Sequence, residues 1–187
     1  MFQTTWSPSS KSQVLVRFKS KVKEKNVSNN ESVFSSIESQ KKSQFRLQVT
    51  SSNGTWTLKT VLDSNKIGYQ KVRNKDSGFA ASQEVNYIPK KGGLGFTIRY
   101  ALFDTETFDN RIYSYERDLP GVFSMTSFYG KGSRFSFLFH CNYSKAISIQ
   151  FKIGHSFYRD RQNVGTALEQ VKGNQLTDLR GLIVCKF

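Results

Sequence analysis

Hydrophobic and polar residues alternate with a period of two along most of the chain, a pattern typical of β-strands with one apolar and one polar face. Residues 134–143 are the clearest case, because Phe135, Phe137 and Phe139 fall on one face and the other face holds Arg134, Ser136, His140 and Asn142. The alternation argues against a helical protein and predicts about ten strands. They span residues 14–23, 45–50, 56–63, 79–87, 94–102, 111–118, 122–128, 134–143, 146–155 and 177–187.

The connections between these strands are local, which predicts an all-β, antiparallel, up-and-down meander. Counted back from the C-terminus, five connections are short, at residues 142–145, 119–121, 89–93, 51–54 and 7–10. The intervening ones are mostly longer and polar, at residues 159–175, 104–110, 71–76 and 24–43, and the short one at residues 129–132 is the exception. Short turns on one side and long loops on the other are typical of outer-membrane β-barrels. We therefore expect a transmembrane barrel of about ten strands, closed by itself or part of a larger barrel.

The last predicted strand supports a membrane barrel. Its outward face is expected to hold Leu179, Ile183, Cys185 and the terminal Phe187, which would sit at a membrane interface. The same strand could also be a core strand of a soluble β-domain, and its pattern alone does not decide between the two.

Length and composition fit one domain over residues 1–187. Only 37% of the residues are hydrophobic, yet 14% are aromatic, which suits strands with one face toward a polar lumen. No run approaches the roughly 20 apolar residues of a membrane helix, and no signal peptide opens the chain. A turn at residues 7–10 leaves little room for a preceding strand. Upstream sequence or a partner chain is therefore expected to complete the barrel.

The polar faces are strongly basic, in line with a net charge of +14. This charge points to polyanionic partners such as nucleic acid, lipopolysaccharide-like headgroups or anionic solutes. The bases expected on the lumen side, as a candidate anion path, are Arg17, Lys19, Lys21, Arg46, Lys59, Arg99, Arg134, Lys152 and Arg180. The alternative is that they pair with Glu84, Asp63 or inward-folded loops, and this alternative is favoured.

The remaining residues that could act in catalysis or bind a ligand predict no enzyme, no cofactor and no metal site. No nucleophile–base pair, paired acids or metal-ligand spacing is present in the sequence. The acids Glu106, Asp109, Glu116 and Asp118 fit no calcium loop, so pairing with Arg or Lys is expected.

Cys141 and Cys185 fall in phase with outward apolar residues on strands separated by residues 146–155, about 9–10 Å apart. They should therefore be two free, lipid-facing thiols.

Three stretches carry a resemblance to a known family. They are residues 103–118, residues 128–135 and the terminal Lys186-Phe187. Together they resemble the C-terminal β-barrel of large bacterial outer-membrane proteins that carry helix-hairpin-helix modules upstream. The resemblance covers most of the chain from Ser7 onward. It implies an outer-membrane location and contact with DNA through modules that this chain lacks.

Three functions follow from these observations. The first is an integral outer-membrane barrel, or its C-terminal portion, acting as a passive channel or scaffold with a basic lumen for anionic solute or nucleic acid. Its partners would be outer-membrane lipid and, through the C-terminal strand, the barrel-assembly machinery. The second is a soluble lipocalin-like barrel that holds a small apolar ligand. The third is a soluble basic β-domain that binds nucleic acid.

Overall fold

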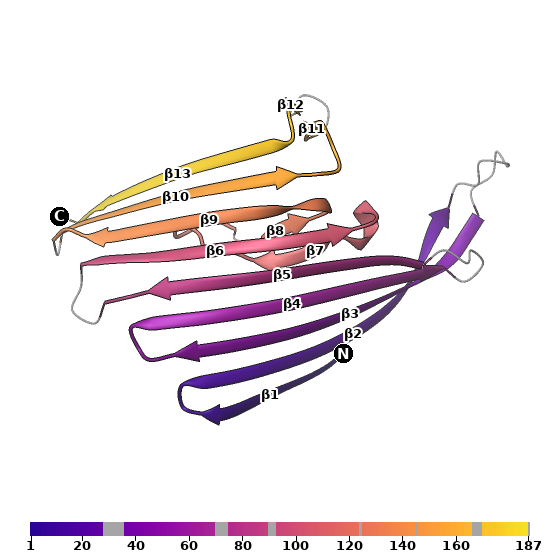
Figure 1. The fold of residues 1–187 in the computed structure, drawn as a ribbon, viewed down its shortest axis with the longest axis horizontal. Coiled ribbons are helices and arrows are strands. Elements are labelled where there is room, and N and C mark those ends of the chain that lie inside the picture. Colours follow the sequence, from indigo (N-terminus) through magenta and orange to yellow (C-terminus); the bar gives the residue numbers. More distant parts are fainter. Residues whose placement is uncertain are drawn as a thin grey trace.

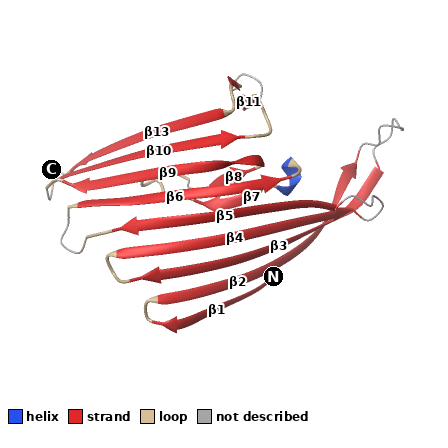
Figure 2. Cartoon of the chain, viewed as in Figure 1, coloured by secondary structure: helices blue, strands red, loops and turns tan. Residues whose placement is uncertain are grey.

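The computed structural model describes residues 1–27, 36–69, 75–89, 93–123, 125–144, 146–165 and 170–186. These residues form almost entirely antiparallel β-structure, as Figure 2 shows, with a single 3-10 turn, η1, at Phe108–Asn110. The prediction of an all-β meander is confirmed. Within the described part of the chain, no helix is long and apolar enough to cross a membrane.

Nine strands form one sheet in which spatial order follows chain order (Figure 1). They are β1 (Phe2–Ser9), β2 (Ser12–Val27), β3 (Ser36–Ser52), β4 (Trp56–Tyr69), β5 (Lys75–Tyr87), β6 (Leu94–Thr105), β9 (Gly130–Asn142), β10 (Ile147–Tyr158) and β13 (Gln175–Cys185). Strands β1 and β13 are the two edges, and no described residue pairs with the outer side of either. The sheet is therefore open, and the closed barrel expected from the sequence is not seen among these strands.

The start of the chain and the stretch at residues 24–43 differ from the prediction. Residues Phe2–Ser9 form a full strand that pairs with β2, and the turn follows Ser9. Strand β2 continues to Val27 and β3 begins at Ser36, so much of the predicted polar loop is extended. The serine- and lysine-rich composition suggested a loop, but backbone pairing between β2 and β3 holds these residues in the sheet. Residues 28–35 lie outside the described part.

Two stretches predicted as strands of the meander lie outside the nine-stranded sheet. They are β7 (Ile112–Tyr115) and β8 (Met125–Phe128), which pair with one another from Ile112↔Phe128 to Tyr115↔Met125. Strand β6 instead pairs directly with β9. Residues 106–123 and 125–129, together here named the crossing loop, fold back over one face of the sheet, and β7 lies against β4 and β5 (Figure 1). The prediction was wrong here because the polar and charged side chains of this loop match that face of the sheet.

This correction sharpens the difference between the two ends of the sheet. The predicted turn at residues 119–121 lies within the crossing loop, and residues 130–132 belong to β9, so the exception at residues 129–132 disappears. One end now carries the connections at residues 10–11, 53–55, 88–93 and 143–146. The other carries residues 28–35, 70–74, 106–129 and 159–174, which include β11 (Asn163–Val164) and β12 (Val171–Lys172).

The two faces of the sheet have opposite character and opposite exposure. Along β6, Ile98, Tyr100 and Leu102 are 38%, 48% and 48% exposed, whereas Arg99 and Ala101 between them are 3% and 2% exposed. We call these faces the apolar face and the polar face. The apolar face is open, and the crossing loop covers much of the polar face. Large apolar side chains therefore lie outside and charged ones inside, the reverse of a soluble domain.

A small apolar core fixes the crossing loop where it returns to the sheet. Phe103 of β6 stacks on Phe128 of β8, with ring centroids 4.8 Å apart and planes 3° from parallel. The partly buried Tyr158 packs edge-on against Phe103. Ala80, Ala101 and Ile112 complete the cluster. Because the cluster joins β5, β6, β7 and β8, it holds the loop against the centre of the sheet.

Candidate functional site

The first half of the crossing loop is held through its backbone carbonyls. The carbonyls of residues 109, 111, 113 and 115 accept hydrogen bonds from polar-face side chains, and that of Asn110 also accepts one, from Asn65 at 3.3 Å. Lys42 Nζ donates to the Asp109 carbonyl at 2.8 Å, and Asn65 Nδ2 donates to the Arg111 carbonyl at 3.2 Å. Further along, Arg46 Nη2 donates to the Tyr113 carbonyl at 3.0 Å, and Arg99 Nη1 donates to the Tyr115 carbonyl at 2.6 Å. The loop thus passes from β3 over β4 to β6.

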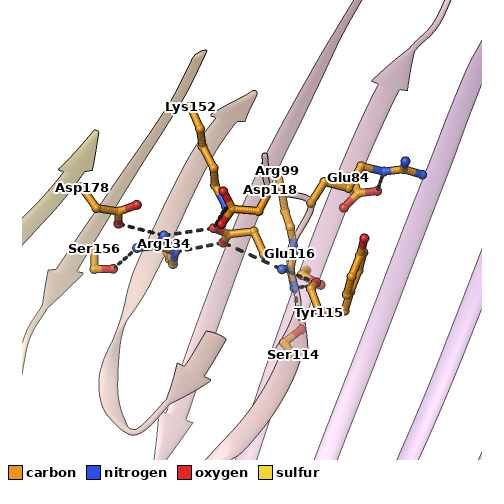
Figure 3. A network of polar contacts seen from close by, with 12 residues as sticks. Glu84, Arg99, Ser114, Tyr115, Glu116, Asp118, Arg134, Lys152, Ser156 and Asp178 are labelled. Atoms are coloured by element: carbon orange, nitrogen blue, oxygen red, sulfur yellow. Dashed lines mark hydrogen bonds and ion pairs between the residues drawn. The ribbon is translucent and has the colours of Figure 1, made fainter. Parts of the chain in front are cut away.

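The next residue, Glu116, is the centre of a buried ion network (Figure 3). Arg134 of β9 donates to both carboxylate oxygens of Glu116, with Nε–Oε2 at 2.9 Å and Nη2–Oε1 at 3.0 Å. Lys152 Nζ of β10 lies 2.9 Å from Glu116 Oε1. All three side chains are nearly inaccessible to solvent. A buried charge is tolerated only when it is paired and hydrogen-bonded, and these residues satisfy one another.

The network continues to the last strand of the sheet. Asp118 accepts from Lys152 Nζ at 2.8 Å and from Arg180 of β13. Asp178, also on β13, accepts from Arg134 Nη2 at 2.9 Å. From residue 109 to residue 118, the crossing loop therefore traverses the polar face from β3 to β13.

Burial would by itself raise the pKa of Glu116, but its hydrogen bonds and charge contacts with Arg134 and then Lys152 outweigh burial and lower this pKa below 4.5. The pKa of Asp118 follows the same balance: burial raises it, and the hydrogen bond from Lys152 with further contacts brings it below 3.8. Both carboxylates therefore remain ionised and hold the loop in place over the neutral pH range.

The lowered pKa values predict loss of stability in acid. A carboxylate with a depressed folded pKa contributes its full stability above its unfolded pKa and loses it as pH falls through the folded pKa. The free energy of unfolding should be flat above about pH 5 and decline below about pH 4.5. Urea unfolding across this range measures the decline, which should be shallower in Glu116→Gln. An equally steep decline in that variant would contradict this account.

Gly154 of β10 provides a local test of the network. A Cβ at this position would lie 2.3 Å from Arg134 Nη2 and 2.6 Å from Asp178 Oδ1, closer than real contacts allow. We expect Gly154→Ala to push this ion pair apart and to destabilise the fold by about 1–3 kcal/mol, as overpacking does. The control is Gly181→Ala on the neighbouring β13, where a Cβ meets nothing within 4 Å. Equal unfolding free energies for the two variants would contradict the prediction.

Six of the nine bases predicted for the polar face contact the crossing loop. Arg46, Arg99, Arg134, Lys152 and Arg180 make the bonds given above, and Lys59 Nζ lies 5.7 Å from the ring centroid of Tyr115. Arg46 also forms an ion pair with Asp63, with Nε–Oδ1 at 2.6 Å. Glu84 pairs with Arg117 of the loop instead of with a base of the sheet. These six bases hold a loop against the polar face.

The other three predicted bases, Arg17, Lys19 and Lys21, lie together on β2. Arg17 is half-buried and the two lysines are exposed. None of them forms an ion pair with a described residue. In the sheet register Arg17 stands opposite Arg46, and Lys21 stands opposite Lys42. Like charges placed directly opposite one another are destabilising unless an anion lies between them.

Several residues of the network were missed by the sequence analysis. Pairing of Glu116 and Asp118 with Arg and Lys was expected and is confirmed, whereas Glu106 instead accepts from the backbone and side chain of Ser77. Asp178 was not singled out, although it lies two residues before Arg180 and so on the same face of β13. Lys42 and Asn65 gave no signal, because their acceptors are backbone carbonyls.

The terminal strand and the cysteines follow the predicted phase. Leu179, Ile183 and Cys185 lie on the open apolar face, and Phe187 is outside the described residues. Both cysteines are free, and β10 lies between their strands because Ile149 pairs with Cys141 and Ile147 with Cys185. The absence of a disulfide between them is confirmed, and their contact with lipid remains a prediction.

Within the described residues, no group of three or more His, Cys, Asp or Glu side chains could hold a metal ion. Comparison of the chain with protein-family models, with curated proteins and with solved structures returned no match.

Proposed function

We propose that the chain forms the wall of an integral outer-membrane β-barrel, or the C-terminal portion of one. The barrel acts as a passive channel or scaffold with a basic lumen. One observation carries the proposal: large apolar side chains lie exposed on one face of the sheet while paired charges lie buried on the other. A bilayer against the apolar face and a polar lumen inside account for both halves of this pattern.

The exposed apolar side chains of this face adjoin one another across neighbouring strands. Ile98, Tyr100 and Leu102 of β6 continue sideways into Phe135 of β9 and Phe79 of β5, all substantially exposed. Soluble monomers rarely expose contiguous apolar patches of more than a few hundred Å². Strands β6, β9 and β10 are also long enough to cross a hydrocarbon core when tilted.

The connections support an orientation in the membrane. Most short turns lie at the end of the sheet where β13 finishes, and the two longest connections, residues 106–129 and 159–174, lie at the other end. In outer-membrane barrels the short turns face the periplasm and the long loops face outward. The crossing loop leaves from the long-loop end, so it would fold into the lumen from the cell exterior.

The two edges of the sheet limit how the barrel can close. Nine successive antiparallel strands leave β1 and β13 running in the same direction (Figure 1). An antiparallel barrel needs an even number of strands, so an odd number of further strands must lie between these edges. Polypeptide outside residues 1–187 or a partner chain would supply them. Strand β13, with its apolar outer face, is also the strand through which we expect the barrel-assembly machinery to act.

The lipocalin-like alternative fits the structure less well. In a soluble ligand-carrying barrel the phenylalanine-rich faces surround the ligand and the basic faces meet water. Here the charged face is covered and holds Arg99, Arg134 and Lys152 nearly free of solvent contact.

Refolding tests the proposal. Urea-denatured protein, diluted into lipid vesicles together with the polypeptide that supplies the missing strands, should float with them, resist removal by high salt and alkaline carbonate, and migrate on electrophoresis faster unheated than boiled. The matched control is the same dilution without lipid, which should give aggregates. A soluble, monomeric and fully folded product without lipid or detergent would overturn the proposal.

A further inference from the structure

A row of four basic side chains runs along the polar face of β2. Arg17, Lys19, Lys21 and Lys23 occupy alternate positions of this strand, so all four project from one side. Successive members are two residues apart, or about 6.7 Å, and the row is about 20 Å long. None of the four forms an ion pair with a described residue. The bases that contact the crossing loop are held by its acids, its carbonyls or the ring of Tyr115. Among the described residues, no acid forms an ion pair with this row.

The row lines one side of a groove, here named the β2 groove. Two adjoining cavities of about 430 and 290 Å³ share Lys19, Gln44 and Tyr113 as lining residues. Strand β2 forms one wall, and the edge of the crossing loop at Arg111 and Tyr113 forms the other. The acids that line it are Asp63, which is bound to Arg46, and Asp109 of the loop. The groove is therefore elongated and strongly positive.

The opposite wall adds a flat, partly exposed surface. Arg111 Nε donates to the hydroxyl of Tyr113 at 2.6 Å, and its guanidinium lies 5.4 Å from the centroid of that ring. The same guanidinium lies 4.1 Å from the ring centroid of Phe108. These contacts fix Tyr113 at the groove with its ring accessible. Aromatic and guanidinium surfaces beside a basic groove can stack planar groups as well as bind phosphate.

We propose that the β2 groove binds a linear polymer of phosphate groups, whose phosphates lie along Arg17, Lys19, Lys21 and Lys23. The binding relieves the repulsion between the directly opposed pairs Arg17–Arg46 and Lys21–Lys42. The inference rests on the proposed function in that the groove opens into the lumen. The proposed site places the anion path beside the crossing loop and away from the centre of the sheet, where the bases are paired with acids of the loop.

Binding is measured by fluorescence anisotropy with protein in vesicles or detergent, against a labelled short polyphosphate and a labelled oligothymidylate. The test variant is Lys19→Gln/Lys21→Gln/Lys23→Gln, which should fold because these lysines are exposed and form no ion pair with a described residue. The control variant, Lys11→Gln/Lys172→Gln/Lys186→Gln, removes the same charge at exposed positions outside the groove. We expect the test variant to bind at least about tenfold more weakly near 0.1 M salt, and its slope of log affinity against log salt to fall by about 2. The control variant should differ little from the wild type.

The source of the phosphates is decided by a second variant, Tyr113→Ala. If Tyr113→Ala binds the oligothymidylate more weakly than the wild type does but binds polyphosphate equally well, the ligand is a single-stranded nucleic acid. If Tyr113→Ala binds both probes as tightly as the wild type does, the site recognises the phosphate chain alone. Equal affinities of test and control variants would overturn the proposal, and so would polyglutamate binding as tightly as polyphosphate. Flotation of the same vesicles is scored separately. Protein that floats but shows no groove-dependent binding refutes this inference alone, and protein that does not float refutes the membrane proposal.

Discussion

Replacing Glu116 with glutamine should lower the free energy of unfolding by about 3 kcal/mol, the usual cost of breaking a buried ion pair. The glutamine keeps the shape of the side chain but leaves Arg134 and Lys152 without its charge. Asp178 and Asp118 still contact these two bases, so the fold should survive in a weakened form. Urea unfolding of vesicle-inserted protein, followed by tryptophan fluorescence, measures the change.

The matched control is Asp104→Asn, at the end of β6. Asp104 pairs with Lys131 at 3.2 Å, but these side chains are 54% and 60% exposed. Exposed pairs contribute at most about 1 kcal/mol, so this variant should unfold almost as the wild type does. If both variants lose the same stability, the network of Figure 3 does not hold the crossing loop.

Replacing Ile98 with arginine should cost about 2–4 kcal/mol in vesicles, because arginine near the bilayer midplane meets hydrocarbon. Ile98 lies midway along β6 on the apolar face, with Val85 and Phe137 beside it in the sheet. In a soluble domain a partly exposed position of this kind tolerates arginine within about 1 kcal/mol.

The same substitution at Leu94 provides the control. Leu94 lies on the same face of the same strand but at its first residue, close to the short turns. Arginine near an interface costs only about 0–1 kcal/mol. The difference between the two positions therefore reports depth in a membrane. Equal and small costs at both positions would contradict a bilayer on this face.

Much of the sheet could be predicted from the sequence, because the alternation that defines a strand also decides which face each residue occupies. The Phe-rich face of β9 and the basic face of β2 both lie as this alternation predicts. Closure could not be predicted, since pairing between edge strands depends on partners far away in sequence or outside it.

The crossing loop was missed because it has the same period of two. Ile112, Ser114 and Glu116 are buried while Tyr113 and Tyr115 are exposed, as in a strand of the main sheet. A local pattern shows that a residue is extended but does not name its partner strand. The exception at residues 129–132 was the available signal, because it broke an otherwise regular succession of turns and loops. A second signal was the pair of acids Glu116 and Asp118, which face a basic surface.

The most direct test of the membrane account is a scan of single cysteines along β6 in vesicles, with Cys141 and Cys185 replaced by serine. Residues 97–102 are each changed to cysteine, labelled with an environment-sensitive fluorophore and exposed to a quencher carried on lipid chains. The account predicts strong quenching at 98, 100 and 102 and weak quenching at 97, 99 and 101, in step with the exposure of these side chains in the structure. Quenching without this period of two, or ready access of an aqueous quencher to 98, 100 and 102, would contradict it.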